Sequence, residues 1–137
     1  IDALDLGRSV GATVDTTVSG TGGFVNVPSL SATITTRGGP VLCLLTSRVT
    51  SSASDAFLIQ PAPVGEIHYV AIKRGSTRFG VNQFNGFSAD GGSNGSSITW
   101  YDTPAAGTHT YQIESSAAGG VSVTFKDLRL ICLELAL

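Results

Sequence analysis

Residues 66–84, EIHYVAIKRGSTRFGVNQF, carry the clearest structural signal in this chain. Two stretches rich in β-branched and aromatic residues, 66–73 and 77–84, flank a short polar segment that contains a glycine. Such runs on either side of a glycine-containing turn are typical of a β-hairpin. The stretch therefore predicts two antiparallel strands that are joined by a tight turn at 74–76.

The same kind of signal recurs along the rest of the chain. Turns rich in glycine and proline separate further candidate strands at 30–35, 40–52, 55–59, 98–101, 108–115, 121–125 and 128–135. A spacing of about 8–12 residues is typical of a sandwich or barrel, and no segment has the apolar period of a helix. We therefore expect an all-β fold, an antiparallel β-sandwich with jelly-roll topology over residues 24–137. Residues 1–23 are expected to form an extended N-terminal arm with one edge strand.

Composition favours strands and turns and excludes several classes of protein. The 137 residues include 17 Gly, 16 Ser, 15 Thr and no Met, and only 13% are charged. A hydrophobic content of 42% argues against disorder, and the few basic residues at a net charge of −2 argue against binding nucleic acid. No apolar run approaches the ~18 residues of a membrane span, so no membrane insertion is expected. Because the chain starts at Ile1 and lacks methionine, we expect a cut fragment or a processed product.

The two cysteines, Cys43 and Cys132, each lie inside an apolar run. The simplest interpretation is a pair of reduced thiols that pack as small hydrophobic residues. A disulfide between them requires neighbouring strands whose Cβ atoms lie within about 4.5 Å. Neither cysteine has a histidine at ligand spacing, so no metal site is predicted.

Residues that could support catalysis occur singly, so we predict a non-enzyme with no catalytic residue and no cofactor. The segment 91–95 (GGSNG) matches the G-x-S-x-G pattern of hydrolases, but it lies in a glycine-rich loop with no helix after it. Both histidines, His68 and His109, fall within predicted strands, where such residues are more often structural. The ten acidic residues are scattered, without the spacing expected of a calcium loop or a glycosidase pair.

Two segments are candidates for ligand binding. The stretch 73–78 holds three of the eight basic residues at a hairpin tip, which suits an anionic sugar or phosphate, although a solvated turn is the plain alternative. The loop 85–97 combines aromatic, carboxylate and amide side chains, which suit sugar recognition, although a flexible glycine loop is the plain alternative. The predicted glycan contacts are Phe87, Asp90, Asn94, Arg74 and Arg78.

The last predicted strand is apolar on both of its faces, interrupted only by Arg129 and Glu134, and residues 41–45 show the same two-sided pattern. A two-layer sandwich buries only one face of each sheet, so something else must cover the second face. A neighbouring copy of the chain is the simplest cover, and we expect a homotrimer. The predicted interface residues are Leu128, Leu130, Ile131, Leu133 and Leu135.

Several stretches resemble the C-terminal domains of phage tail fibres and related virion appendages. They are 101–111 (YDTPAAGTHTY), 130–135 (LICLEL), 33–45 and 69–78, and together they span residues 30–135. The resemblance implies a trimeric jelly roll, similar to tumour-necrosis-factor-like heads, at the tip of a fibre or spike on a virion. It implies no cofactor and no shared catalytic residues.

The sequence therefore predicts a virion adhesion domain, a phage tail-fibre or spike tip that binds a glycan on the host cell surface. One alternative is a capsid decoration protein that contacts neighbouring virion proteins through the arm at 1–23. Another alternative is a carbohydrate-binding module of a larger enzyme.

Overall fold

The computed structural model describes residues 9–10, 16–19, 22–47, 58–62, 67–85, 97–117, 122–126 and 128–135. These residues form strands and no helix, which confirms the predicted all-β class. The strands are β1 (Ser9–Val10), β2 (Thr16–Ser19), β3 (Val25–Thr36), β4 (Val41–Ser47), β5 (Leu58–Ala62), β6 (Ile67–Arg74), β7 (Thr77–Asn85), β8 (Ile98–Asp102), β9 (Gly107–Ala117), β10 (Ser122–Lys126) and β11 (Leu128–Glu134).

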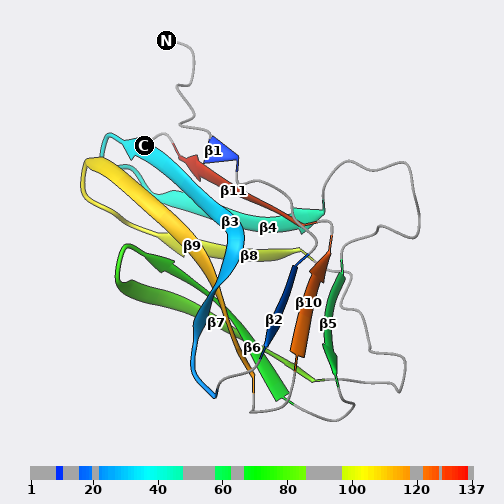
Figure 1. Ribbon diagram of the computed structural model, residues 1–137. Helices are drawn as coiled ribbons and strands as arrows, with labels where there is room; N and C mark the ends of the chain where they lie inside the picture. Colours follow the sequence, from blue (N-terminus) through cyan, green and yellow to red (C-terminus); the bar gives the residue numbers. More distant parts are fainter. Residues whose placement is uncertain are drawn as a thin grey trace.

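The strands make three antiparallel sheets, which are arranged as two layers (Figure 1). One layer is the four-stranded sheet β3-β9-β6-β7. The other layer contains the sheet β1-β11-β4-β8 and the short sheet β2-β10-β5. These two sheets have matching strand orders, because β2 follows β1, β10 precedes β11 and β5 follows β4 along the chain. The short sheet therefore continues three strands of its larger neighbour.

The core lies between the layers and takes alternate side chains from each strand, since successive residues of a strand point to opposite faces. In β3, Leu30, Ala32 and Ile34 are buried, whereas Ser31 and Thr33 are exposed. A single cluster of buried residues draws on strands of all three sheets. The two layers thus share one hydrophobic core.

The same alternation corrects part of the predicted oligomer interface. Leu128 and Leu130 are 0% exposed in the single chain and belong to its core. Their assignment to an interface is wrong, because a side chain without exposed surface cannot contact a second chain. Ile131 and Leu133, which alternate with them along β11, are half-buried, and Leu135 is exposed. The assignment of these three residues to an oligomer interface stays a prediction.

The structure contains the hairpin that the sequence predicted. β6 and β7 pair from Ile67 opposite Asn85 to Arg74 opposite Thr77, and the turn occupies residues 75–76. Gly75 adopts a φ of +56°, a conformation that side chains disfavour. The backbone of the predicted turn therefore favours glycine at this position.

Two segments of the predicted N-terminal arm are strands of the sandwich. β1 pairs with β11, and β2 pairs with β10, so each is an edge strand. The arm therefore contributes two edge strands rather than the one expected. Of the strand expected at 55–59, only residues 58 and 59 are among the described residues, and both belong to β5, which runs from Leu58 to Ala62. β5 also contains Pro61, which is tolerated because β5 is an edge strand.

Trp100 of β8 packs against Gly80 of β7 across the open side of the sandwich. A Cβ atom added at Gly80 would lie 2.1 Å from Cδ1 and 2.6 Å from Nε1 of the indole. Real atoms do not approach so closely, and Trp100 is almost completely buried. The absence of a side chain at Gly80 therefore makes room for the indole of Trp100, which belongs to the opposite layer.

We expect Gly80→Ala to lower the free energy of unfolding by about 1–3 kcal/mol, because the indole must move within a packed core. Gly23→Ala is the matched control, since no atom lies within 4 Å of its added Cβ and its φ is not positive. The control should change stability by less than about 0.5 kcal/mol. Urea denaturation measures both values, and a Gly80→Ala protein as stable as the wild type would contradict this packing.

Candidate functional site

The two arginines at the hairpin tip reach partners in different layers of the sandwich. Arg74 Nη1 donates to Asp102 Oδ2 at 2.5 Å, and Asp102 lies on β8 of the other layer. Arg78 Nε donates to Glu114 Oε2 at 2.7 Å, and Glu114 lies on β9 of the same sheet. The structure therefore separates the two arginines that the sequence grouped as glycan contacts. The loop contacts Phe87, Asp90 and Asn94 fall outside the described residues and stay a prediction.

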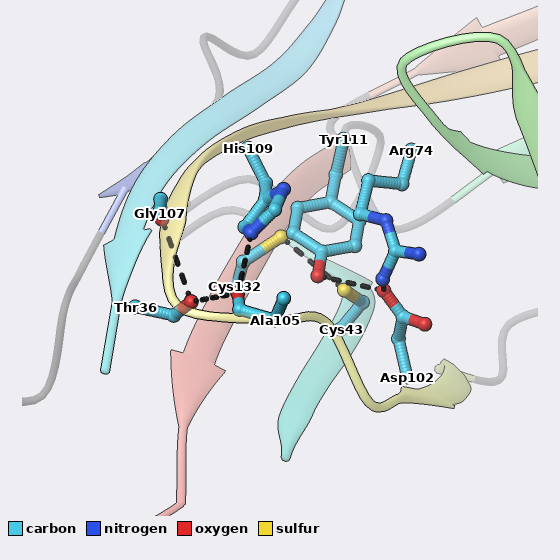
Figure 2. A network of polar contacts seen from close by, with 9 residues as sticks. All are labelled: Thr36, Cys43, Arg74, Asp102, Ala105, Gly107, His109, Tyr111 and Cys132. Atoms are coloured by element: carbon cyan, nitrogen blue, oxygen red, sulfur yellow. Dashed lines mark hydrogen bonds and ion pairs between the residues drawn. The ribbon is translucent and has the colours of Figure 1, made fainter. Parts of the chain in front are cut away.

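Arg74 belongs to a polar bridge between the layers, which Figure 2 shows from close by. The hydroxyl of Tyr111, on β9, donates to the same Oδ2 atom of Asp102 at 2.9 Å. Tyr111 has no exposed surface, and burial, followed by its hydrogen bond to Asp102, raises the pKa of its hydroxyl. Phe79 packs edge-on against the Tyr111 ring, with ring centroids 5.9 Å apart. The guanidinium of Arg74 thus stabilises the contact between the two layers through its bond to Asp102.

Neither histidine is placed for catalysis. His109 Nε2 donates to the carbonyl of Ala105 at 2.8 Å, and Thr36 Oγ1 donates to the same carbonyl at 3.0 Å (Figure 2). These bonds fix the turn between β8 and β9, which the sequence predicted at 102–107. His68 lies fully buried on β6, where burial lowers its pKa to about 4. Its ring is therefore neutral at physiological pH.

The outer face of the β3-β9-β6-β7 sheet carries a cluster of charged and aromatic side chains. Glu114 is at its centre: Oε1 lies 3.2 Å from Lys73 Nζ, and Oε2 accepts the hydrogen bond from Arg78. The Arg78 guanidinium lies 3.7 Å from the centroid of the Phe24 ring. The Phe24 ring lies 6.3 Å from the ring of Tyr69, at an angle of 46°. We call these five residues the Glu114 cluster.

Strand register places the cluster on one face. Residues directly opposite each other in an antiparallel pair share a face, and so do residues two apart along a strand. Glu114 is opposite Ala71, which lies between Tyr69 and Lys73 on β6, and Lys73 is opposite Arg78 on β7. The core residues of β6 and β9 occupy the alternate positions. The cluster therefore faces away from the core.

Only part of this polar face is free to bind a ligand. Gln112 donates through Nε2 to the carbonyls of Val27 and Leu30, at 2.9 and 3.1 Å, where the β3–β9 register is irregular. Its amide is used by the fold. Gln83, by contrast, is exposed directly opposite Tyr69, and Asn26 is exposed directly opposite Glu114.

The carboxylates within the described ranges all accept bonds from the chain itself. Asp102 accepts from Arg74 and Tyr111, and Glu114 accepts from Arg78. Glu134 Oε1 accepts from the backbone N–H groups of residues 37 and 39, at 2.7 and 2.8 Å. No group of three or more His, Cys, Asp or Glu side chains suited to a metal occurs in the described part of the chain. The same residues contain no helix with the length and apolar character of a membrane span.

Sequence reasoning missed Phe24, Tyr69 and Glu114 as site residues. The alternation in 108–115 does place Gln112 and Glu114 on the polar face of their strand. The missing information was that β9 pairs with β6, because that pairing brings Glu114 beside Lys73 and Arg78.

No protein-family model and no curated protein sequence matches this chain, whereas solved structures do. The Eiger TNF from S. frugiperda is similar over 96% of this chain and 93% of its own, with 7% identity and a TM-score of 0.51. A family 35 carbohydrate-binding module from an environmental isolate is similar over 99% and 95%, with 10% identity and a TM-score of 0.42. A carbohydrate-binding module of Cellvibrio mixtus lichenase 5A, in complex with cellotriose, has 16% identity and a TM-score of 0.38, over 90% and 88%. The likeness to Eiger TNF concerns the fold alone, and the chain is a jelly-roll β-sandwich.

Proposed function

We propose that this domain is a non-enzymatic carbohydrate-binding domain whose ligand surface is the outer face of the β3-β9-β6-β7 sheet. The half-buried ring of Tyr69 beside the ordered charges of the Glu114 cluster carries this proposal. A sugar ring has an apolar C–H face and a rim of hydroxyl groups, so it needs a flat ring and polar groups close together.

Tyr69 is the ring best placed to meet the apolar face of a sugar. Phe24 lies beside it, but the Arg78 guanidinium lies over the Phe24 ring. We therefore propose that Tyr69 supplies the ring that stacks on the sugar, and that Phe24 packs beside it as a support. A tyrosine also has a hydroxyl at its tip that can bind a sugar hydroxyl.

Lys73 and Arg78 supply charged donors, which make stronger hydrogen bonds than neutral groups do. Glu114 holds both of them in place before any ligand arrives. Binding therefore costs less side-chain entropy than it would for two free cations. The exposed amides of Gln83 and Asn26 extend the polar rim on either side of the cluster.

The loop predicted to bind glycan begins where β7 ends, at Asn85, two positions after Gln83. We propose that Phe87, Asp90 and Asn94 extend the same ligand surface from this edge strand. Arg74 is not included, because its guanidinium is engaged by Asp102.

A self-associating head, as in a tail-fibre or spike tip on a virion, is a second candidate that a different observation favours. On the outer face of the β1-β11-β4-β8 sheet, Leu133 is opposite Leu42, which is opposite Tyr101. Tyr101 is 58% exposed. Ile131 and Leu44, two positions away along β11 and β4, form the neighbouring opposed pair on the same face. Apart from Thr99, which is exposed opposite Leu44, these positions are apolar or aromatic. Such a face is suited to contact with further copies of the chain, and we propose a homotrimer. The structure gives less support to the capsid-decoration alternative, because the strands of the arm, β1 and β2, are already paired within the sandwich.

For the carbohydrate proposal, we expect wild-type protein to bind members of a glycan array. Tyr69→Ala should weaken binding to the best of these glycans by about 10-fold or more, as titration calorimetry measures, since tenfold corresponds to about 1.4 kcal/mol. Tyr101→Ala is the matched control, because Tyr101 is an exposed tyrosine on the opposite outer face, and it should bind like the wild type. Circular dichroism checks that both variants are folded. An array without any bound glycan, or a loss confined to Tyr101→Ala, would contradict the proposal.

For the second candidate, light scattering should give a native mass of about three times the 14.0 kDa chain. Leu133→Glu should reduce that mass to one chain, because it places a charge within the apolar face. Val81→Glu is the matched control on the other outer face, where Val81 is 52% exposed, and it should leave the assembly intact. A monomeric wild-type protein at high micromolar concentration would refute self-association.

A further inference from the structure

Cys43 and Cys132 lie directly opposite each other on β4 and β11, in the interior of the sandwich. Their sulfur atoms are 3.4 Å apart, and Cys132 Sγ donates to Cys43 Sγ (Figure 2). Both thiols are free and have no exposed surface. We infer that this pair is a disulfide-forming site, which closes when the chain folds in an oxidising environment.

The backbone already has the geometry that a disulfide requires. Opposite residues of an antiparallel pair have Cα atoms about 4.5–5.5 Å apart, and disulfides occur at Cα separations of about 4.4–6.8 Å. The two sulfur atoms need to approach by about 1.4 Å to reach the bond length of about 2.05 Å. Small rotations of the two side chains can supply that movement, so the strands can stay in register.

The reaction is an ordinary thiol–disulfide exchange with a small disulfide such as oxidised glutathione. One cysteine thiolate attacks the glutathione disulfide, forms a mixed disulfide and releases one glutathione thiol. The second cysteine then attacks the mixed disulfide, forms the Cys43–Cys132 bond and releases the second glutathione. The protein loses two electrons and two protons, and the oxidant gains both.

Burial determines when the reaction can occur. The folded chain leaves no surface of either thiol for an oxidant to reach. The hydrogen bond from Cys132 and the burial of the pair also raise the pKa of the Cys43 thiol, which disfavours the reactive thiolate. The reduced folded protein should therefore resist oxidation, whereas the folding chain can react as β4 and β11 meet.

The bond would connect positions 89 residues apart and would join two neighbouring strands at the middle of their sheet. A link across so long a segment restricts the unfolded chain strongly. For a domain of this size, the expected rise in melting temperature is about 10 °C.

The test is to denature and reduce the full chain and then refold it with either a mixture of oxidised and reduced glutathione or dithiothreitol. After denaturing alkylation, mass spectrometry should find both cysteines blocked in the first sample and alkylated in the second. The oxidised protein should melt about 10 °C higher than the reduced protein. Folded, reduced protein given the same glutathione buffer should stay reduced over the same period.

Cys43→Ala and Cys132→Ala are the controls, and the refolding buffer should not change the melting temperature of either. If refolding is poor, incubation with glutathione at the urea midpoint tests the same closure, because the chain folds and unfolds repeatedly there. Two alkylatable cysteines after both treatments, or disulfides only between chains, would overturn the inference. Rapid oxidation of the folded protein would overturn the proposed order of events.

Discussion

The pairing of β4 with β11 is the constraint on which the rest of the structure depends. It joins 41–47 to 128–134 in a single register, so the first third of the chain meets its end. That register places Glu134 where its carboxylate accepts the backbone N–H groups of the β3–β4 turn. It also sets the two cysteines opposite each other and turns Leu128 and Leu130 into the core. A slip of one residue would reverse every one of these faces.

A single core leaves the sandwich with two outer faces of different character. Asp102 on β8 accepts hydrogen bonds from Arg74 on β6 and Tyr111 on β9, and so connects the two layers. These polar groups therefore stabilise the fold rather than face a ligand. The Glu114 cluster lies outside the core: Glu114 itself is 5% exposed, whereas Lys73, Arg78 and the two aromatic rings remain at least partly exposed. The face around Tyr101 is apolar instead. Ligand binding on one face and self-association through the other are therefore compatible within one domain.

The features that the sequence predicted are those set by local chemistry. The hairpin at 66–84 follows from its glycine turn, and the alternation in 108–115 separates Glu114 from the core residues Tyr111 and Ile113. Strand pairing is not local, since Glu114 meets Arg78 only because β9 lies beside β6. On β11, by contrast, both faces are mostly apolar, and each carries one charged residue: Glu134 on the inner face and Arg129 on the outer face. The sequence pattern therefore does not distinguish the two faces, and from it alone Leu128 and Leu130 are expected at an interface.

The most direct test of the proposed ligand surface is a titration of isotope-labelled protein with its bound oligosaccharide, followed by NMR. The amide signals that shift should come from Asn26, Tyr69, Lys73, Gln83 and Glu114, which lie on one outer face. Signals of Leu42, Tyr101 and Leu133, on the opposite outer face, should stay in place. Shifts confined to that second face, or no shifts with any glycan, would contradict the account.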